Sequence, residues 1–154
     1  MPHPRTSLFA LLAALIVTGL AAGVAFAEPT GSACARIRSE ARTGTPEQVM
    51  FLFVRTGVLR VDPACAYDLV TARVRKKATR ATFAAGKAHI APYRTKQPTD
   101  VLADYVPRTR LPDQAGSWIT LDAPDLKPRT FEIVLQKRNG RWLVDYWALA
   151  VGFN

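Results

Sequence analysis

The chain has 154 residues, and its 21 Lys and Arg outnumber its 12 Asp and Glu, for a net charge of +9. Of the two His, only His89 lies beyond the first 27 residues, which excludes a multi-His metal centre there, and the two Cys are spaced like no zinc motif. No glycine-rich phosphate loop is present, so we expect neither metal nor cofactor. The positive charge either favours anionic surroundings, such as phospholipid headgroups, acidic wall polymers or acidic partners, or only keeps the protein soluble.

An apolar segment opens the chain. Residues 8–27 carry no charge, follow Arg5, and end in Ala25-Phe26-Ala27, a pattern that signal peptidases cleave. A core helix would need a polar face, which this segment lacks. Residues 1–27 are therefore predicted to be a signal peptide or N-terminal anchor. The protein is expected to be exported, either secreted or attached to the outer face of the cytoplasmic membrane. A retained anchor and lipidation at Cys34 are alternatives to cleavage.

A polar lead-in, residues 28–44, precedes a single domain at 45–154, and residues 33–42 can form a short helix. The two cysteines, Cys34 and Cys65, predict a disulfide, because an even count in an exported chain usually forms bonds. Two buried thiols are the alternative.

Three helices are expected next. Thr45-Pro46-Glu47-Gln48 is typical of a helix start with a capping box, and the apolar residues after it predict a buried helix at 45–59. Asp62-Pro63 repeats the start signal and predicts a helix at 62–77. A third helix at 79–85 should end at Gly86.

The pattern then changes to strands, predicted at 101–111, 117–122, 131–135 and 141–151. Pro107 requires an edge position, a bulge or a break in the first of them. Asn139-Gly140 predicts a two-residue hairpin turn. Simple alternation puts Trp142, Val144, Tyr146 and Ala148 on one face of the last strand, and Leu143, Asp145, Trp147 and Leu149 on the other. Both faces are mainly apolar, so both should be covered, and the expected fold class is α+β.

The order of elements and the ending Asn139-Gly140-Arg141-Trp142-Leu143-Val144-Asp145-Tyr146-Trp147 resemble the nuclear transport factor two-like superfamily, also called ketosteroid isomerase-like or cystatin-like. Residues 51–71 and 86–93 are also similar to uncharacterised secreted or membrane-anchored bacterial members. The resemblance covers residues 45–151 and implies N-terminal helices packed into a strongly curved, cone-like antiparallel sheet. Its members include enzymes, adaptors and anchored parts of secretion machines, so fold alone does not decide the activity.

No catalytic set is evident in the sequence. In an enzyme with such a fold, Asp145 would be the base, with Tyr105 or Tyr146 as the hydrogen-bond donor and Tyr93 as a further candidate. The competing interpretation is a structural carboxylate that accepts hydrogen bonds from Arg141 or from backbone amides. His89, in a loop, is expected to be structural or exposed.

A basic run is the other candidate site. Its cations could dock on anionic lipid or wall polymer, or could simply be a solvated helix end; they are Arg73, Arg75, Lys76, Lys77 and Arg80. Three tryptophans of the predicted sheet are expected to line the core or a pocket: Trp118, Trp142 and Trp147.

The sequence favours a non-enzymatic interaction or scaffold module of the bacterial cell envelope, which could also hold a small apolar ligand in the cone. An isomerase, cyclase or dehydratase and an anionic-surface docking protein are the alternatives. The expected partner is an envelope protein, anionic lipid or wall polymer, with a homodimer also compatible. Nucleic acid is not expected, because no aromatic residues are interleaved with the charge.

Overall fold

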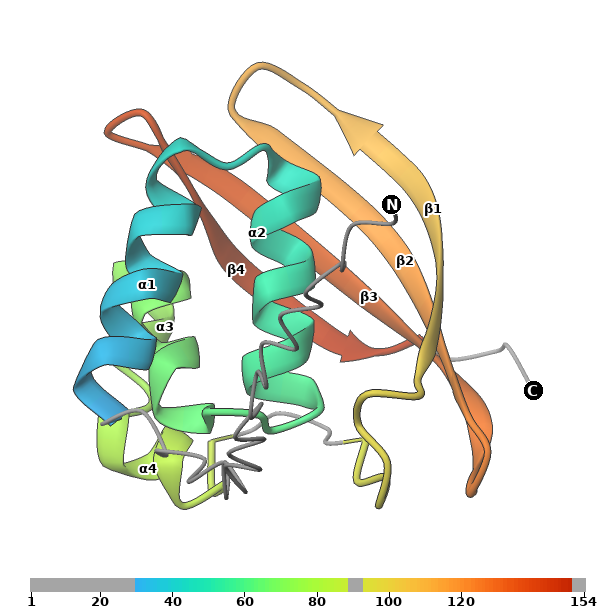
Figure 1. Cartoon of the computed structure of the whole chain (residues 1–154). Coiled ribbons are helices and arrows are strands. Elements are labelled where there is room, and N and C mark those ends of the chain that lie inside the picture. Colours follow the sequence, from blue (N-terminus) through green and yellow to red (C-terminus); the bar gives the residue numbers. More distant parts are fainter. Residues whose placement is uncertain (1–29, 89–92, 151–154) are drawn as a thin grey trace, which may run out of the picture.

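The computed structural model describes residues 30–88 and 93–150. The interpretations of residues 1–27 and of His89 lie outside these residues. The fold is α+β, as predicted: a set of helices packs on one face of a four-stranded sheet (Figure 1). The sheet is not strongly curled, so the cone-like curvature that the resemblance implies is not confirmed.

The helical half begins before residue 45. Helix α1 (Thr30–Thr43) lies in the segment predicted as a lead-in and contributes Cys34, Ile37 and Ala41 to the core. The predicted disulfide is confirmed: it joins Cys34 to Cys65, whose Cα atoms are 4.9 Å apart. This bond fastens α1 to the helical turns that follow α2.

Helix α2 (Pro46–Phe53) starts as the sequence predicts. The Thr45 hydroxyl accepts a hydrogen bond from the Gln48 amide at 3.3 Å, and the Gln48 side chain accepts one from the Thr45 amide at 2.8 Å. The helix then widens into the π-turn η1 (Val54–Val58), where the Leu59 amide donates to the Val54 carbonyl at 2.8 Å. The predicted helix 45–59 is therefore present, with a change of pitch at its end.

The continuous helix predicted at 62–77 is wrong. Residues Pro63–Leu69 form the 3-10 helix η2, Val70 and Thr71 are extended, and α3 spans only Ala72–Arg75. The break has a tertiary cause, because Val70 pairs with the sheet at Val144 and the Thr71 amide donates to the Val144 carbonyl at 3.0 Å. Helix α4 (Arg80–Ala84) follows, and Gly86 ends it at φ 67°, as predicted.

The sheet is an antiparallel meander in the order β1-β2-β3-β4. The four strands are β1 (Leu102–Arg110), β2 (Gln114–Ala123), β3 (Leu126–Arg138) and β4 (Arg141–Leu149). The two central strands, β2 and β3, are longer than predicted. Pro107 lies on an edge strand beside a register shift, as predicted. Asn139 and Gly140 have positive φ values of 51° and 76°, as a type I′ hairpin turn requires.

A β-bulge in β4 changes which side chains face the helices. Leu135 pairs with Val144 and Val134 with Tyr146, so Asp145 is the extra residue. Beyond the bulge Trp147 pairs with Ile133, a core residue, so it joins Val144 on the covered face. The simple alternation predicted for this strand is therefore wrong.

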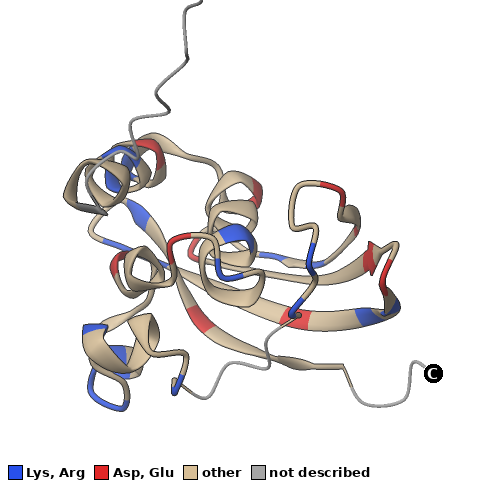
Figure 2. Ribbon diagram, turned by 60° about the horizontal axis from the view of Figure 1, so that its bottom comes forward, with Lys and Arg blue, Asp and Glu red and all other residues tan. Residues whose placement is uncertain are grey.

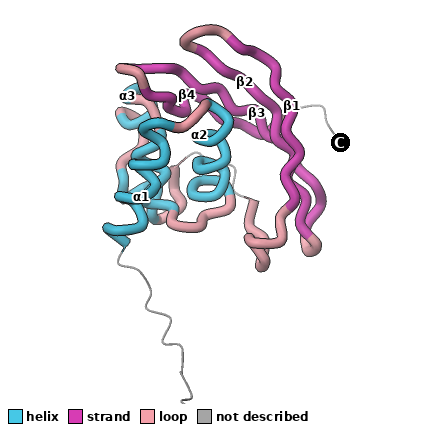
Figure 3. The backbone as a smooth tube through the Cα atoms, turned by 45° about the horizontal axis from the view of Figure 1, so that its top comes forward, coloured by secondary structure: helices cyan, strands magenta, loops and turns pink. Residues whose placement is uncertain are grey.

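The core lies between the helices and one face of the sheet (Figure 3). Its largest fully buried side chains come from both layers: Met50, Phe53, Leu69, Phe83, Tyr93, Ile119, Leu121, Phe131, Ile133 and Leu135. Figure 3 shows no helix on the opposite face of the sheet, where Val106 and Tyr146 are exposed. The expectation that both faces of the last strand are covered is thus not met among the described residues.

Tyr93, a candidate donor from the sequence, is a structural residue. Its buried hydroxyl donates to the Lys127 carbonyl and accepts from the Ala123 amide, both at 3.1 Å. Replacing Tyr93 with Phe should lower the free energy of unfolding by about 1–3 kcal/mol, because the buried Ala123 amide loses its acceptor. Urea denaturation measures this. Tyr146→Phe, at an exposed tyrosine, is the control and should change stability little.

Candidate functional site

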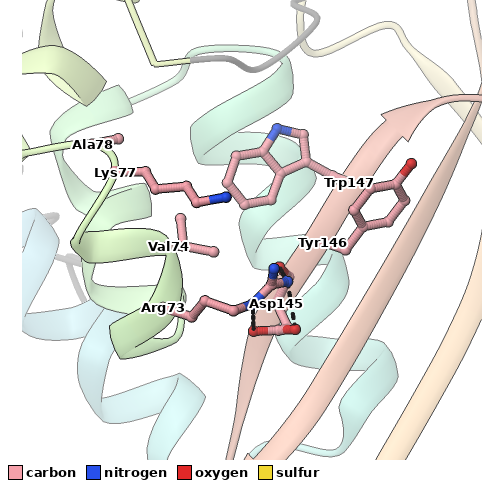
Figure 4. Close-up of a pocket in the computed structure, with 7 residues that line it drawn as sticks. All are labelled: Arg73, Val74, Lys77, Ala78, Asp145, Tyr146 and Trp147. Carbon is pink, nitrogen blue, oxygen red and sulfur yellow. Dashed lines mark hydrogen bonds and ion pairs between the residues drawn. The ribbon is translucent and has the colours of Figure 1, made fainter.

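A pocket of about 240 Å³ lies between β4 and the region of α3 with the turn that follows it (Figure 4). Val74, Ala78 and Trp147 give it apolar walls, and Lys77 extends across it toward the Trp147 ring. The complete lining is Arg73, Val74, Lys77, Ala78, Asp145, Tyr146 and Trp147. The pocket therefore combines apolar walls with the cationic side chains of Arg73 and Lys77.

The inner wall of the pocket is fixed by aromatic packing. The Trp147 ring lies 4.9 Å from Phe53 of α2 and 6.3 Å from Phe83 of α4, centroid to centroid. These contacts join the pocket to the core, so its shape depends on the packing of two helices against β4.

Asp145 lines this pocket, but its carboxylate is already engaged. Arg73 makes a bidentate pair with it, with Nη2–Oδ2 at 2.7 Å and Nε–Oδ1 at 3.1 Å. The Thr71 hydroxyl donates to Oδ1 at 2.6 Å, and Arg73 also donates to the Asp145 carbonyl at 2.7 Å. The partner is thus Arg73 rather than Arg141. Three of the roughly four acceptor positions of this carboxylate are thus already used within the protein.

The electrostatics of Asp145 agree with a structural role. Burial raises the pKa of its carboxyl, but hydrogen bonds from Arg73 and Thr71 and the charge of Arg73 outweigh this effect. The pKa therefore lies below its ordinary value of 3.8. A general base at neutral pH is normally tuned in the opposite direction. Asp145 is thus an ionised anchor for Arg73 and poorly suited to take a proton.

This geometry predicts a stability change with pH. Because the folded pKa of Asp145 is lowered, its contribution is complete above pH 3.8 and is lost as pH falls through the folded pKa. Asp145→Asn should therefore be less stable than the wild type at pH 6, with the gap narrowing below pH 3.8. Thermal unfolding of both proteins between pH 2 and pH 6 measures the gap. A gap that stays constant across this range would contradict the assignment.

Of the two tyrosines proposed as donors, only Tyr146 lies near Asp145. Tyr105 lies on β1, at the opposite edge of the sheet from β4, and its hydroxyl is 3.3 Å from Glu47 of α2. Glu47 also forms an ion pair with Arg110. Tyr146 lines the pocket next to Asp145, but it is exposed on the side of the strand away from the core. The pair of Asp145 and Tyr105 is therefore not brought together.

Most of the predicted basic run is bound within the protein. Arg73 pairs with Asp145, and Arg80 pairs with Asp68, to which it donates from Nη1 at 3.2 Å. Arg75 donates to the Asp68 carbonyl at 3.3 Å. The guanidinium groups of Arg75 and Arg80 also lie 5.2 and 5.0 Å from the centre of the Tyr67 ring. Tyr67 and Asp68 were not identified from the sequence, because the 3-10 helix that presents them carries no distinctive pattern.

Two cations of the run remain at the surface. Among the described residues, no ion pair involves Lys76 or Lys77, and only Lys77 lines the pocket. Figure 2 shows Lys and Arg spread over helices, loops and strands and interspersed with Asp and Glu.

The three tryptophans occupy separate places. Trp147 lines the pocket, whereas Trp142 is buried near the hairpin turn, with the Lys137 ammonium 5.7 Å from its ring centre. Trp118 lies on β2, with the Arg108 guanidinium 4.0 Å from its ring centre. Only Trp147 therefore belongs to a candidate site.

A second, more open groove of about 510 Å³ lies between the end of α1 and α2. Phe51 and Leu52 supply its apolar surface. The sequence did not suggest this groove, and it contains none of the predicted site residues.

No cluster of three or more His, Cys, Asp or Glu side chains that could hold a metal is found in residues 30–88 and 93–150. Over the same residues, no helix combines the length and apolar character needed to cross a membrane. Comparisons of the chain with protein-family models, curated proteins and solved structures gave no match.

Proposed function

We propose that the protein is an exported bacterial envelope protein, which works as a non-enzymatic interaction module and receives its partner at the pocket between α3 and β4. The observation that carries the proposal is the pocket itself, which combines apolar walls with the Lys77 side chain. Its carboxylate, Asp145, is neutralised by Arg73 and serves to hold α3 against β4. The apolar walls of such a pocket can bind an apolar group of the partner, and Lys77 can select a partner with a negative charge beside that group.

The alternative functions have less support. An isomerase, cyclase or dehydratase would need Asp145 to accept a proton, while its lowered pKa and its contacts with Arg73 and Thr71 oppose this. Docking on anionic lipid or wall polymer would have to rely on Lys76 and Lys77. The three arginines of the same run are occupied by Asp145, Asp68 and Tyr67.

Site-specific cross-linking in native envelopes tests this proposal. The photo-reactive residue benzoylphenylalanine replaces Ala78 in the pocket or, as a control, Leu102 of β1, which is 72% exposed. Irradiation should yield one dominant protein adduct from position 78 and none of the same mass from position 102. Identical adduct patterns from both positions, or no protein adduct from either, would refute a partner site at the pocket.

A further inference from the structure

The outer edge of β4 is covered around Val144 and Asp145. Val70 and Thr71 run beside Val144, and the Thr71 amide donates to the Val144 carbonyl at 3.0 Å. One residue further along, Arg73 occupies the Asp145 carbonyl at 2.7 Å. These contacts occupy the outward carbonyls of Val144 and Asp145.

The second half of this edge is open in the part of the chain that the structure describes. The Ala150 amide donates to a carbonyl of β3 at 2.9 Å, which fixes the alternation of β4. Because every second residue of an antiparallel pair exchanges both backbone hydrogen bonds with its partner, Ala148 and Tyr146 face β3. The N–H and C=O groups of Trp147 and Leu149 therefore point away from β3, and no described backbone segment pairs with them.

The opposite edge of the sheet differs in its chemistry. Strand β1 carries Pro107, beside a register shift, and the charged residues Asp104, Arg108 and Arg110. Proline, charges and bulges are the usual means of keeping an edge strand from pairing with another chain. Residues 146–149 of β4 have none of them, so the two edges are not equally protected.

The pocket lies along this open edge. Tyr146 and Trp147 belong to both, and Val74 and Ala78 form the wall that faces the strand across the pocket. An added strand could thus bond to the backbone of β4 and place one apolar side chain between β4 and α3. Lys77 would stand next to that side chain.

We propose that this edge accepts an extended segment of a partner protein as a further β-strand, with an apolar side chain in the pocket and a neighbouring carboxylate facing Lys77. This inference rests on the proposed interaction function and names the chemistry of the partner. Main-chain hydrogen bonds to Trp147 and Leu149 supply affinity, and the pocket and Lys77 select the sequence. The positive charge of the protein, +9, complements an acidic segment.

Fluorescent heptapeptides with a central Leu, Val or Phe flanked by Glu test the proposal with the full chain, against the same peptides with Lys in place of Glu. The Glu peptides should bind more tightly. Lys77→Glu should weaken their binding about tenfold, as expected for the loss of a charge-assisted contact, and Lys76→Glu, outside the pocket, much less. If the two variants weaken binding equally, the preference for Glu peptides reflects only the overall positive charge. The placement of the peptide carboxylate beside Lys77 would then be wrong.

A matched pair of variants at Leu149 tests the proposed backbone hydrogen bonds. Leu149→Pro removes an outward N–H, and Leu149→Ala removes the side chain but keeps the N–H. The proline variant should bind the Glu peptides about tenfold more weakly than the alanine variant, through the loss of one hydrogen bond. Amide exchange on the wild type gives a readout that needs no variant. Peptide should slow exchange at Trp147 and Leu149 and leave Ala148, already bonded to β3, unchanged.

Two results would overturn strand addition. The first is peptide binding that does not protect the Trp147 and Leu149 amides from exchange. The second is an envelope partner that cross-links equally well from position 78 in the Leu149→Pro and Leu149→Ala variants. In the second case the proposed interaction function would survive, because a partner would still be present at the pocket. If no partner cross-links but the peptide still protects Trp147 and Leu149, the proposed interaction function would be refuted, whereas the inference that this edge accepts a strand would stand.

Discussion

Replacing both Cys34 and Cys65 with Ser should lower the free energy of unfolding by about 3–4 kcal/mol. The disulfide closes a loop over a sequence separation of 31 residues, and loop-closure entropy assigns a bond of this span an effect of that size. Both cysteines are buried against the core, so α1 is expected to detach first when the bond is absent.

Urea denaturation of three samples measures this effect: the oxidised wild type, the wild type with reductant, and the double serine variant. The last two should unfold at similar urea concentrations, well below the first. An oxidised and a reduced wild type that unfold together would show that the bond contributes nothing to stability. Single serine variants are poor controls, since each leaves one thiol free to form bonds between molecules.

Replacing Phe53 with Ala should cost about 3–5 kcal/mol, because it opens a cavity under the pocket. Phe53 is 0% exposed and packs against the Trp147 ring. Gly57, one turn later, approaches so closely that a Cβ there would lie 3.2 Å from the Phe53 ring. This tight packing leaves little freedom for the surroundings to close the cavity.

Phe51, on the same helix but 40% exposed, is the matched control. Phe51→Ala should cost about 1 kcal/mol or less, as is usual for an exposed site. Chemical denaturation of both variants gives the comparison, and similar losses would contradict the placement of the core. Small domains are stable by only about 5–15 kcal/mol in total, so Phe53→Ala could leave the chain partly unfolded at 37 °C.

Local signals in the sequence were sufficient where a short motif determines the backbone. The capping box at Thr45 and the turn at Asn139-Gly140 appear in the structure as predicted, because each depends on residues within four positions of one another. Pro107 was likewise predicted to require an edge position, a bulge or a break, since a residue without N–H cannot bond on both sides, and it lies on an edge strand beside a register shift.

Prediction failed where a distant contact overrides the local preference. The sequence 62–77 has a helix start and helix-forming residues, yet Val70 pairs with Val144, more than 70 residues away, and interrupts the helix. The bulge at Asp145 is equally hidden, because an extra residue in a strand leaves no mark in a run of apolar side chains.

The candidate site was predicted in part for the same reason. Asp145, Tyr146 and Trp147 were named from the chain ending, and they do line the pocket. Arg73 and Asp145 are 72 positions apart, so their pairing could not be read from the sequence. This pairing makes the carboxylate a structural anchor and not a candidate base. Val74 and Ala78, which complete the pocket, were not singled out, because small apolar residues near a helix end have no chemical signature.

The meander of the sheet also bears on how fast the protein folds. Each strand pairs with its neighbour in sequence, so β3 and β4 can zip together from the two-residue turn at Asn139-Gly140 with little loss of chain entropy. The contacts of Val70 and Arg73 with β4 close much longer loops and should form later. The strand edge that awaits a partner is thus expected to exist in the folding chain before α3 is there to form the other wall of the pocket.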